Sequence, residues 1–186
     1  LPHDTPLASN TSTIPIARLA QSLTRPERFA GLHFFNPVRR MKLVEVIRGP
    51  QTSDETVVAL VAHAKRIGKL PIVVRDGPGF LVNRILFPYL QEALKLLEEG
   101  ADPQAIERAA TSFGMPVGPL ELYDLVGLDT AAFAGRTLID AFRDRAVASP
   151  ILPALIEQGR LGQKNGRGFY LVKPRGRSEL DPQLTS

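Results

Sequence analysis

The sequence predicts an α/β part followed by an all-α part, and two patterns of apolar residues support this fold class. Residues 29–35 and 42–47 are short apolar runs rich in aromatic and β-branched side chains, which is typical of buried strands. From residue 80 onward the apolar residues recur at helical spacing instead. The period changes at residues 75–79 (RDGPG), a turn-forming stretch that predicts a domain boundary.

The beginning of the chain predicts a strand, a helix and a strand in that order. Residues 1–12 pass from turn-forming residues to the motif SNTS, which is typical of a strand end or a helix cap. Apolar positions within 14–23 predict a short helix with Pro15 in its first turn. Followed by the strand at 29–35, this order indicates a fragment of an α/β sheet.

A longer helix and another strand are expected before the boundary. Thr52 and Glu55 have the spacing of a capping box, and an apolar stripe follows them. Gly68 stands where a left-handed helix end is expected. Residues 70–74 are then a candidate buried strand.

The second part is predicted to be helical throughout. Residues 80–99 form an apolar helical pattern that Pro88 should kink or split. Asp102 and Pro103 are an N-cap and a first helical residue, and that helix should end at Gly114. Further helices are expected at 119–126, 130–143 and 151–158. Together they indicate a bundle-like domain.

The predicted organisation is an α/β domain over 1–76, a helical domain over 77–172 and a linker or tail over 173–186. The glycine-rich turn at 161–172 lies near a lysine, which is weak evidence for phosphate binding. The last stretch is polar and contains proline, so it is expected to have no core of its own.

A histidine and a glutamate on the two central strands form a candidate catalytic pair. In the run 42–47, Glu45 shares one strand face with apolar neighbours, and a buried carboxylate there needs a partner. His33, near the end of the preceding run, is the available partner if the strands lie side by side. The carboxylate would then fix the imidazole tautomer and raise its basicity. The alternative is a structural histidine and a strand-end glutamate that reaches solvent.

Composition narrows the classes of function. The net charge is +4 and the pI about 9.7, but acidic residues interrupt the basic ones, and no aromatic-basic module for nucleic acid occurs. A basic rim that attracts a phosphorylated ligand such as coenzyme A, or an ordinary solvated surface, explains the charge better. The chain has no cysteine, no cluster of its three histidines that suggests a metal site, and no apolar run as long as a membrane span. A reducing cytoplasm fits this composition.

Six stretches in the same order resemble the L-3-hydroxyacyl-CoA dehydrogenases of fatty-acid β-oxidation. They are SNTS at 9–12, RFAGLHFFNPV at 28–38, MKLVEVI at 41–47, DGPGFLVNRI at 76–85, GMPVGPLELYDLVGLD at 114–129 and GQKNGRGFY at 162–170. The last two are most similar to the dehydrogenase module of the multifunctional β-oxidation proteins. The resemblance implies the C-terminal part of a Rossmann-like NAD-binding domain, followed by a helical domain like the C-terminal domain of 6-phosphogluconate dehydrogenase.

The resemblance also implies roles for individual residues. His33 corresponds to the base that takes the proton of the C3 hydroxyl, and Glu45 to the acid paired with it. Ser12 and Asn36 correspond to residues near both substrate and cofactor. Asn83 corresponds to a residue that hydrogen-bonds the substrate, and Lys164 to a lysine that contacts the cofactor. No metal is implied.

One expected motif is missing from the sequence. The NAD-binding domains of the family begin with a strand, a G-x-G-x-x-G turn and an acidic residue for the ribose, and this sequence has no such turn. The chain is therefore expected to start inside the nucleotide-binding domain and to bind NAD poorly by itself.

The leading hypothesis is NAD-dependent oxidation of (S)-3-hydroxyacyl-CoA to 3-oxoacyl-CoA as part of a longer enzyme. A 3-hydroxybutyryl-CoA dehydrogenase is the narrower alternative, and a non-catalytic helical dimerisation fragment is the alternative from another class. The implied partners are an acyl-CoA and either a second copy of the chain or a larger β-oxidation complex, without nucleic acid. The implied location is the cytoplasm.

Overall fold

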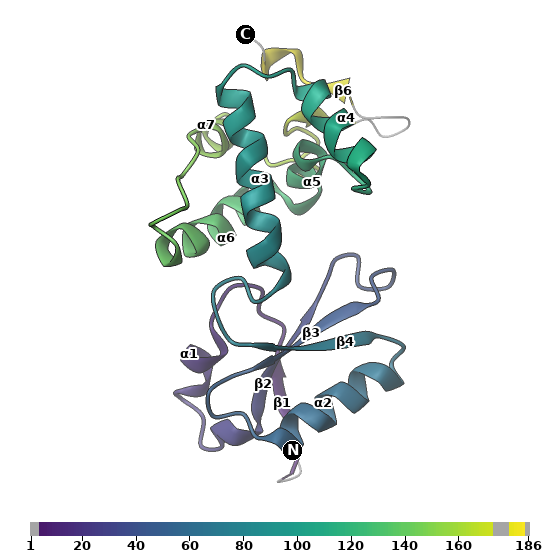
Figure 1. Ribbon diagram of the computed structural model, residues 1–186, viewed down its shortest axis with the longest axis vertical. Helices are drawn as coiled ribbons and strands as arrows, with labels where there is room; N and C mark the ends of the chain where they lie inside the picture. Colours follow the sequence, from purple (N-terminus) through teal and green to yellow (C-terminus); the bar gives the residue numbers. More distant parts are fainter. Residues whose placement is uncertain (1–3, 173–178, 185–186) are drawn as a thin grey trace. The chain divides into compact units, whose positions relative to one another are not determined.

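The computed structural model describes residues 4–172 and 179–184. The chain divides into two compact units, Leu1–Arg84 and Ile85–Ser186 (Figure 1). The first unit is a sheet with helices and the second is helical, so the predicted succession of an α/β part and an all-α part is confirmed.

The first unit contains a four-stranded sheet in which the strands follow their order in the chain. The strands are β1 (Leu7–Ser9), β2 (Phe29–Phe34), β3 (Leu43–Arg48) and β4 (Leu70–Arg75). Helix α1 (Ile16–Ala20) connects the parallel pair β1 and β2, and α2 (Asp54–Arg66) connects the parallel pair β3 and β4. The central pair, β2 and β3, is antiparallel. The predicted strand–helix–strand start is confirmed, and the two apolar runs lie side by side, which was the condition for contact between His33 and Glu45.

Each face of this sheet is covered by one helix, because strand side chains alternate between faces. On one face Leu32 and Val46 pack with Val57 and Leu60 of α2. On the other face the apolar core belongs to α1 and the two central strands; its buried members are Ile16, Ala20, Phe29, Ile47 and Phe80. Figure 1 shows α1 and α2 on either side of the strands. His33 and Glu45 alternate with the α2-facing residues, so both belong to the α1 face.

The beginning of α2 differs from the prediction by one residue. Ser53, not Thr52, is the N-cap, and its side chain accepts a hydrogen bond from the amide of Thr56. The Thr52 hydroxyl instead turns into the protein, where it donates to the carbonyl of Phe29 at 2.6 Å and accepts from the Gly49 amide at 3.0 Å. The Thr52–Glu55 capping box was therefore wrong, because tertiary hydrogen bonds claim the threonine.

Strand β4 is an edge of the described sheet and is less buried than its apolar sequence predicts. Leu70 is 62% exposed and Val73 51% exposed. The strand forms as expected because it pairs with β3 along its whole length. The description of this segment as a buried strand was wrong.

The second unit is built from helices around one core. The helices are α3 (Val82–Glu98), α4 (Pro103–Phe113), α5 (Pro119–Val126), α6 (Leu128–Ala141) and α7 (Ile151–Glu157). Leu94, Leu120, Leu128 and Phe169 are all buried in this core. Asp102 caps α4, Pro103 follows it, and Gly114 ends the helix with φ +118°, as predicted.

Helix α3 differs from its predicted form in two ways. It begins at Val82 rather than at residue 80, because Gly77 to Phe80 form a turn closed by a hydrogen bond from the Phe80 amide to the Gly77 carbonyl. Of the two effects predicted for Pro88, a split is wrong, because one helix continues to Glu98, and a kink stays a prediction. A single proline removes one backbone hydrogen bond, and the buried Leu94 side of the helix still packs into the core.

The described end of the chain packs onto the second unit. Strand β6 (Glu179–Leu180) pairs with β5 (Tyr170–Leu171), and a short 3-10 turn follows. Asp181, 2% exposed, forms ion pairs with Arg160 at 3.2 Å and with Arg167 at 2.7 Å. Residues 179–184 thus differ from the linker or tail expected over 173–186, because a buried carboxylate ties them to the domain; residues 173–178 and 185–186 lie outside the described residues.

Two features are absent from residues 4–172 and 179–184. These residues contain no helix that is long and apolar enough to cross a membrane. They also contain no group of three or more histidine and acidic side chains placed to hold a metal ion.

Candidate active site

His33 and Glu45 form a buried pair in the first unit. They stand directly opposite each other in the antiparallel register of β2 and β3. Their side chains meet, with Nδ1 of His33 2.7 Å from Oε2 of Glu45. The histidine is 6% exposed and the glutamate fully buried. The predicted contact between these two side chains is therefore present.

The second carboxylate oxygen of Glu45 is also hydrogen-bonded. Oε1 accepts from the backbone amides of Leu81 and Val82, each at 3.0 Å. Burial, the largest influence, raises the pKa of Glu45, but the hydrogen bonds from His33, Val82 and Leu81 together outweigh it and lower that pKa below 4.5. Glu45 is thus an anion held in the interior by three donors.

This arrangement selects one tautomer of His33. A charged carboxylate only accepts hydrogen bonds, so the imidazole nitrogen that faces it must carry a proton. The neutral ring therefore has its proton on Nδ1, and no described residue hydrogen-bonds to Nε2. Nε2 is the nitrogen that can accept a proton from another molecule.

Two aromatic rings pack beside the imidazole. The ring centroid of Phe35 lies 4.6 Å from that of His33, and the centroid of Phe80 lies 5.8 Å from it, both tilted by 58°. Phe80 is 4% exposed. The rings limit the rotation of His33 and keep the pair in an apolar surrounding.

The other site residues predicted for the first unit lie at strand and helix ends near the pair. Asn83 follows Val82 in the first turn of α3, and its side-chain amide donates to the carbonyl of Ser12 at 3.3 Å. Asn36 is exposed and lies just beyond β2, separated from the strand by Phe35, and a cis peptide bond joins it to Pro37. Ser12 and Asn36 therefore lie beyond the carboxyl ends of the parallel strands β1 and β2, which is where ligands bind in such sheets.

Lys164 belongs to the second unit, whereas the His33–Glu45 pair belongs to the first. Its Nζ donates to Asp129 at 2.6 Å and to Thr130 at 2.7 Å, at the beginning of α6. The hydrogen bond from Lys164 is the main reason that the pKa of Asp129 is lowered. The loop that carries this lysine is anchored by a buried acid.

That acid is Asp124, whose two oxygens accept from the amides of Phe169 and Tyr170, each at 2.8 Å. A side chain at Gly168 would collide with its carboxylate, so the loop approaches as closely as only glycine permits. Burial is the largest influence on its titration and raises the pKa of Asp124 to about 6 despite the two amides.

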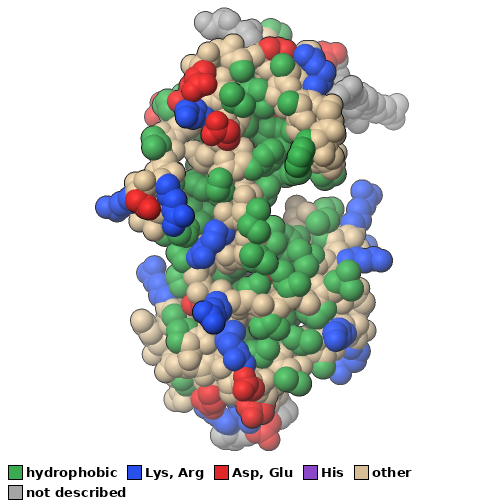
Figure 2. Space-filling view, in the orientation of Figure 1, with side chains coloured by type: hydrophobic (Ala, Val, Ile, Leu, Met, Phe, Trp, Pro, Cys, Tyr) green, Lys and Arg blue, Asp and Glu red, His purple; other side chains and the backbone are tan. Residues whose placement is uncertain are grey.

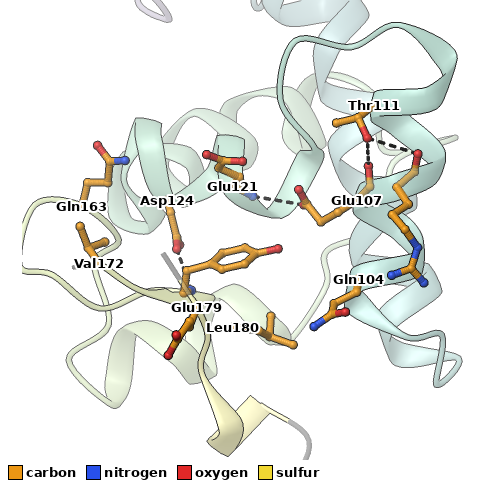
Figure 3. Close-up of a pocket in the computed structure, with 11 residues that line it drawn as sticks. Gln104, Glu107, Thr111, Glu121, Asp124, Gln163, Val172, Glu179 and Leu180 are labelled. Carbon is orange, nitrogen blue, oxygen red and sulfur yellow. Dashed lines mark hydrogen bonds between the residues drawn. The ribbon is translucent and has the colours of Figure 1, made fainter. Parts of the chain in front are cut away.

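Asp124 also lines a cavity of about 600 Å³ in the second unit (Figure 3). Glu107, on α4, points at the first turn of α5 and accepts from the amides of Leu120 at 2.7 Å and Glu121 at 3.2 Å. Burial raises the pKa of Glu107. Glu107 therefore caps a helix and Asp124 anchors a loop, so both of these carboxylates have a structural use.

Several residues that hold the site together were not identified from the sequence. Asn10 accepts a hydrogen bond from the Phe34 amide at 2.9 Å and so joins the ends of β1 and β2. Asp76 accepts from the amides of Ile16 and Ala17 and caps α1. Asn10 and Asp76 are both far in the chain from the amides that they bind, so no local sequence pattern indicates these hydrogen bonds. Asp76 did lie next to the predicted domain boundary.

A buried histidine–carboxylate pair in an α/β unit that is followed by a helical unit is an arrangement suited to proton transfer. Comparison with known families then defines the class. Residues 1–77 match the family described as 3-hydroxyacyl-CoA dehydrogenase, NAD binding domain, and residues 79–172 match 3-hydroxyacyl-CoA dehydrogenase, C-terminal domain. The chain belongs to the 3-hydroxyacyl-CoA dehydrogenase family.

Solved structures agree with this assignment. The chain is 45% identical to (S)-3-hydroxybutyryl-CoA dehydrogenase PaaH1 from Ralstonia eutropha, with a TM-score of 0.85 over 90% of this chain and 60% of that one. It is 39% identical to FadB2 from M. tuberculosis, with a TM-score of 0.87 and the same two coverages, 90% and 60%. It is 41% identical to 3-hydroxybutyryl-CoA dehydrogenase from Escherichia coli, with a TM-score of 0.85 over 94% of this chain and 38% of that one. The chain thus spans about three-fifths of the length of the first two relatives.

The matched domain implies NAD, and the residues present fit one end of it. An imidazole whose Nε2 has no hydrogen-bond partner among the described residues, with polar side chains beyond the carboxyl ends of β1 and β2, suits the reacting end of a nicotinamide nucleotide. The 186 residues contain no G-x-G-x-x-G turn that would cradle its pyrophosphate.

Proposed function

We propose that this chain supplies the acid–base pair for NAD-dependent oxidation of (S)-3-hydroxyacyl-CoA to 3-oxoacyl-CoA in fatty-acid β-oxidation, as part of a longer enzyme. The observation that carries the proposal is the 2.7 Å contact between Nδ1 of His33 and the buried carboxylate of Glu45. It leaves Nε2 as a base, and proton removal from an alcohol is the task that this oxidation sets.

In the proposed reaction His33 accepts the proton of the C3 hydroxyl at Nε2. The imidazolium that results is stabilised by Glu45, which is already charged and fixed by the amides of Leu81 and Val82. NAD, when bound, supplies the acceptor for the hydride that leaves C3. The C3–H bond thus breaks with its electron pair, the O–H bond loses its proton to His33, and the carbonyl forms.

The remaining polar residues are proposed to orient the ligands. Ser12 and Asn83 are already linked to each other and to the turn that holds Glu45. They are suited to hydrogen-bond the hydroxyl or the thioester, and Asn36 would act at the end of β2 beside substrate and cofactor. Lys164 would contact the cofactor from the second unit, in exchange for Asp129 and Thr130.

The test measures NADH oxidation with acetoacetyl-CoA, the reverse reaction. The protein is this chain joined to the part of the Ralstonia relative that the chain does not span. We expect His33→Ala to reduce kcat by about 10²–10⁴-fold, the usual contribution of a general base. His63→Ala is the matched control, since His63 lies on α2 and contacts Arg66. An inactive unmutated fusion, or an unchanged His33→Ala, would contradict the proposal.

The proposal that the chain needs a further segment has its own test. The 186-residue chain alone should show no NADH oxidation above the His33→Ala background, because it contains no pyrophosphate-binding turn. Activity of the chain alone, with NADH saturation, would contradict this part while leaving the dyad proposal intact.

A narrower substrate range is the alternative within the same chemistry. Two of the similar structures are named 3-hydroxybutyryl-CoA dehydrogenases, which favours short acyl chains. Comparing kcat/KM for acetoacetyl-CoA and for a long-chain 3-oxoacyl-CoA would decide this. A preference for the long chain would reject the short-chain alternative.

A second candidate function is assembly, either as a homodimer or within a larger β-oxidation complex. It is favoured by large apolar side chains on the surface of the second unit, where Phe113 is 89% exposed and Phe133 63% exposed. Figure 2 shows hydrophobic side chains at the surface of this unit. Sedimentation of the chain tests it, and a monomer at high concentration would reject self-association.

The proposed location, the cytoplasm, would be checked by imaging a fluorescent fusion.

A further inference from the structure

Phe80 has an unusual backbone conformation beside the candidate site. Among residues 4–172 and 179–184 it is the non-glycine residue with a positive φ, at +48°. Side chains with a Cβ rarely adopt this left-handed region, and residues held in it cluster at functional sites. It directly follows Gly79, which is itself left-handed at φ +70°.

The conformation of Phe80 determines where the following two amides point. The Phe80 amide closes a turn on the carbonyl of Gly77 at 3.0 Å, and the chain then enters α3. The next two amides, those of Leu81 and Val82, are the ones that reach Oε1 of Glu45. A residue in the usual right-handed or extended region at position 80 would redirect both donors.

The side chain of Phe80 also contacts the candidate site, on the His33 side of the pair. Its ring packs in the core of the α1 face, with Phe29 and Ile47 among its members, and lies 5.8 Å from the ring of His33. One residue therefore contacts the imidazole through its ring and adjoins the donors of the carboxylate through its backbone. The core that holds the ring explains why the left-handed backbone persists at a residue other than glycine.

We propose that Phe80 is a positioning residue for the His33–Glu45 pair, fixing the imidazole with its ring and the Glu45 carboxylate through the amides that follow it. The proposal rests on the proposed function in that the pair is taken as the acid–base machinery. Its consequence is that Phe80 maintains the neutral His33 in the Nδ1-protonated form, which leaves Nε2 as the base.

The experiment reads this tautomer directly by long-range ¹H–¹⁵N NMR of the histidine rings in the chain, above the pH at which the rings are protonated. The chain has three histidines, so a His3→Gln and a His63→Gln variant together assign the signals of His33. Wild-type His33 should be protonated at Nδ1. In Phe80→Leu the ratio of Nε2–H to Nδ1–H forms should rise by about tenfold or more, a change that corresponds to about 1.4 kcal/mol.

Phe29→Leu is the matched control. Phe29 belongs to the same core as Phe80 and is similarly buried, at 5% exposed, and no ring contact joins it to His33. It should leave the tautomer ratio unchanged, which a merely structural role of Phe80 would not predict. If Phe80→Leu fails to fold, Phe80→Met is measured instead, because its unbranched side chain has a similar volume and adapts more easily to the space left by the ring.

Two results would overturn the proposal. One is a wild-type tautomer ratio in the folded Phe80 variant, and the other is an equal change in Phe29→Leu, which would mean general loosening of the core. Because the measurement uses neither substrate nor NAD, it stands whatever the outcome of the activity assay. An inactive fusion protein with the expected tautomers would reject the proposed reaction but not the role of Phe80.

Discussion

Replacing Glu45 with glutamine tests how the candidate active site is held together. The amide has the shape of the carboxylate but is neutral, and one of its two ends is a donor. The oxygen of the glutamine side chain can still accept the hydrogen bonds from the amides of Leu81 and Val82. Its nitrogen must then face Nδ1 of His33. His33 has to change to the Nε2-protonated tautomer to accept that bond, and its base is lost.

The stability cost follows from the three hydrogen bonds. Bonds to a charged group contribute about 1.5–3 kcal/mol each, and neutral ones about 0.5–1.5 kcal/mol. Three bonds weaken in this way at a fully buried position, while the neutral amide is less costly to bury. We expect Glu45→Gln to lower the free energy of unfolding at pH 7 by about 1–3 kcal/mol, or roughly 2–4 °C in Tm for each kcal/mol.

Urea unfolding of the chain at several pH values is the assay. The pKa of Glu45 is lowered in the folded state, so its stabilisation is complete above the ordinary value of 4.5 and is lost as the pH falls through the folded-state pKa. The difference between wild type and Glu45→Gln should therefore shrink in acid. Glu98→Gln, at an exposed position, should change the free energy by less than about 0.5 kcal/mol. Equal stabilities at pH 7, or a difference that acid leaves untouched, would refute the reasoning.

Three further predictions concern the groups that support the fold. The carboxyl carbon of Asp124 should titrate with a midpoint of about 6 by NMR, and a midpoint below 4 would contradict the role of burial. Because the pKa of Asp124 is raised on folding, the free energy of unfolding should fall as the pH rises from about 4 to 6. Thr52→Val should cost about 1–3 kcal/mol in thermal unfolding, since it leaves the Gly49 amide and the Phe29 carbonyl without this partner, whereas Thr111→Val on an exposed helix face should be nearly neutral. Leu94→Ala should cost about 2–5 kcal/mol because it opens a cavity at a fully buried position, and Leu96→Ala, at 37% exposed, is the control whose equal loss would count against that explanation.

The dyad could be predicted from the sequence because it depends on short-range rules. Alternation placed Glu45 on an apolar face, where a buried carboxylate needs a partner, and His33 was the available partner if the two strands lay side by side. The resemblance to the dehydrogenase family then favoured the pair. The remaining ligands of Glu45 could not be predicted in the same way. The amides of Leu81 and Val82 are 36 and 37 residues from Glu45. Almost every residue has a backbone amide, so the residue types at these positions do not indicate that the amides bind Glu45.

The differences in the fold have the same origin. Ser53 and Thr52 are equally good caps by composition, and only the buried carbonyl of Phe29 decides which of them turns inward. The described end of the chain is polar, yet Asp181 is buried because Arg160 and Arg167 meet it there. In each case a contact made over a long stretch of chain overrode a local preference.

The two carboxylate oxygens of Glu45 have different partners, so the proposed reaction and the fold both depend on this residue. Oε2 of Glu45 faces the histidine, while Oε1 fastens β3 to the first turn of α3. Residues used only in chemistry can often be replaced with a gain in stability, since evolution leaves strain or unmatched charge at such positions. Glu45 offers no such exchange. A lineage that gave up the proposed reaction would still be expected to retain this acid, so its presence in a relative is evidence for the fold before it is evidence for catalysis.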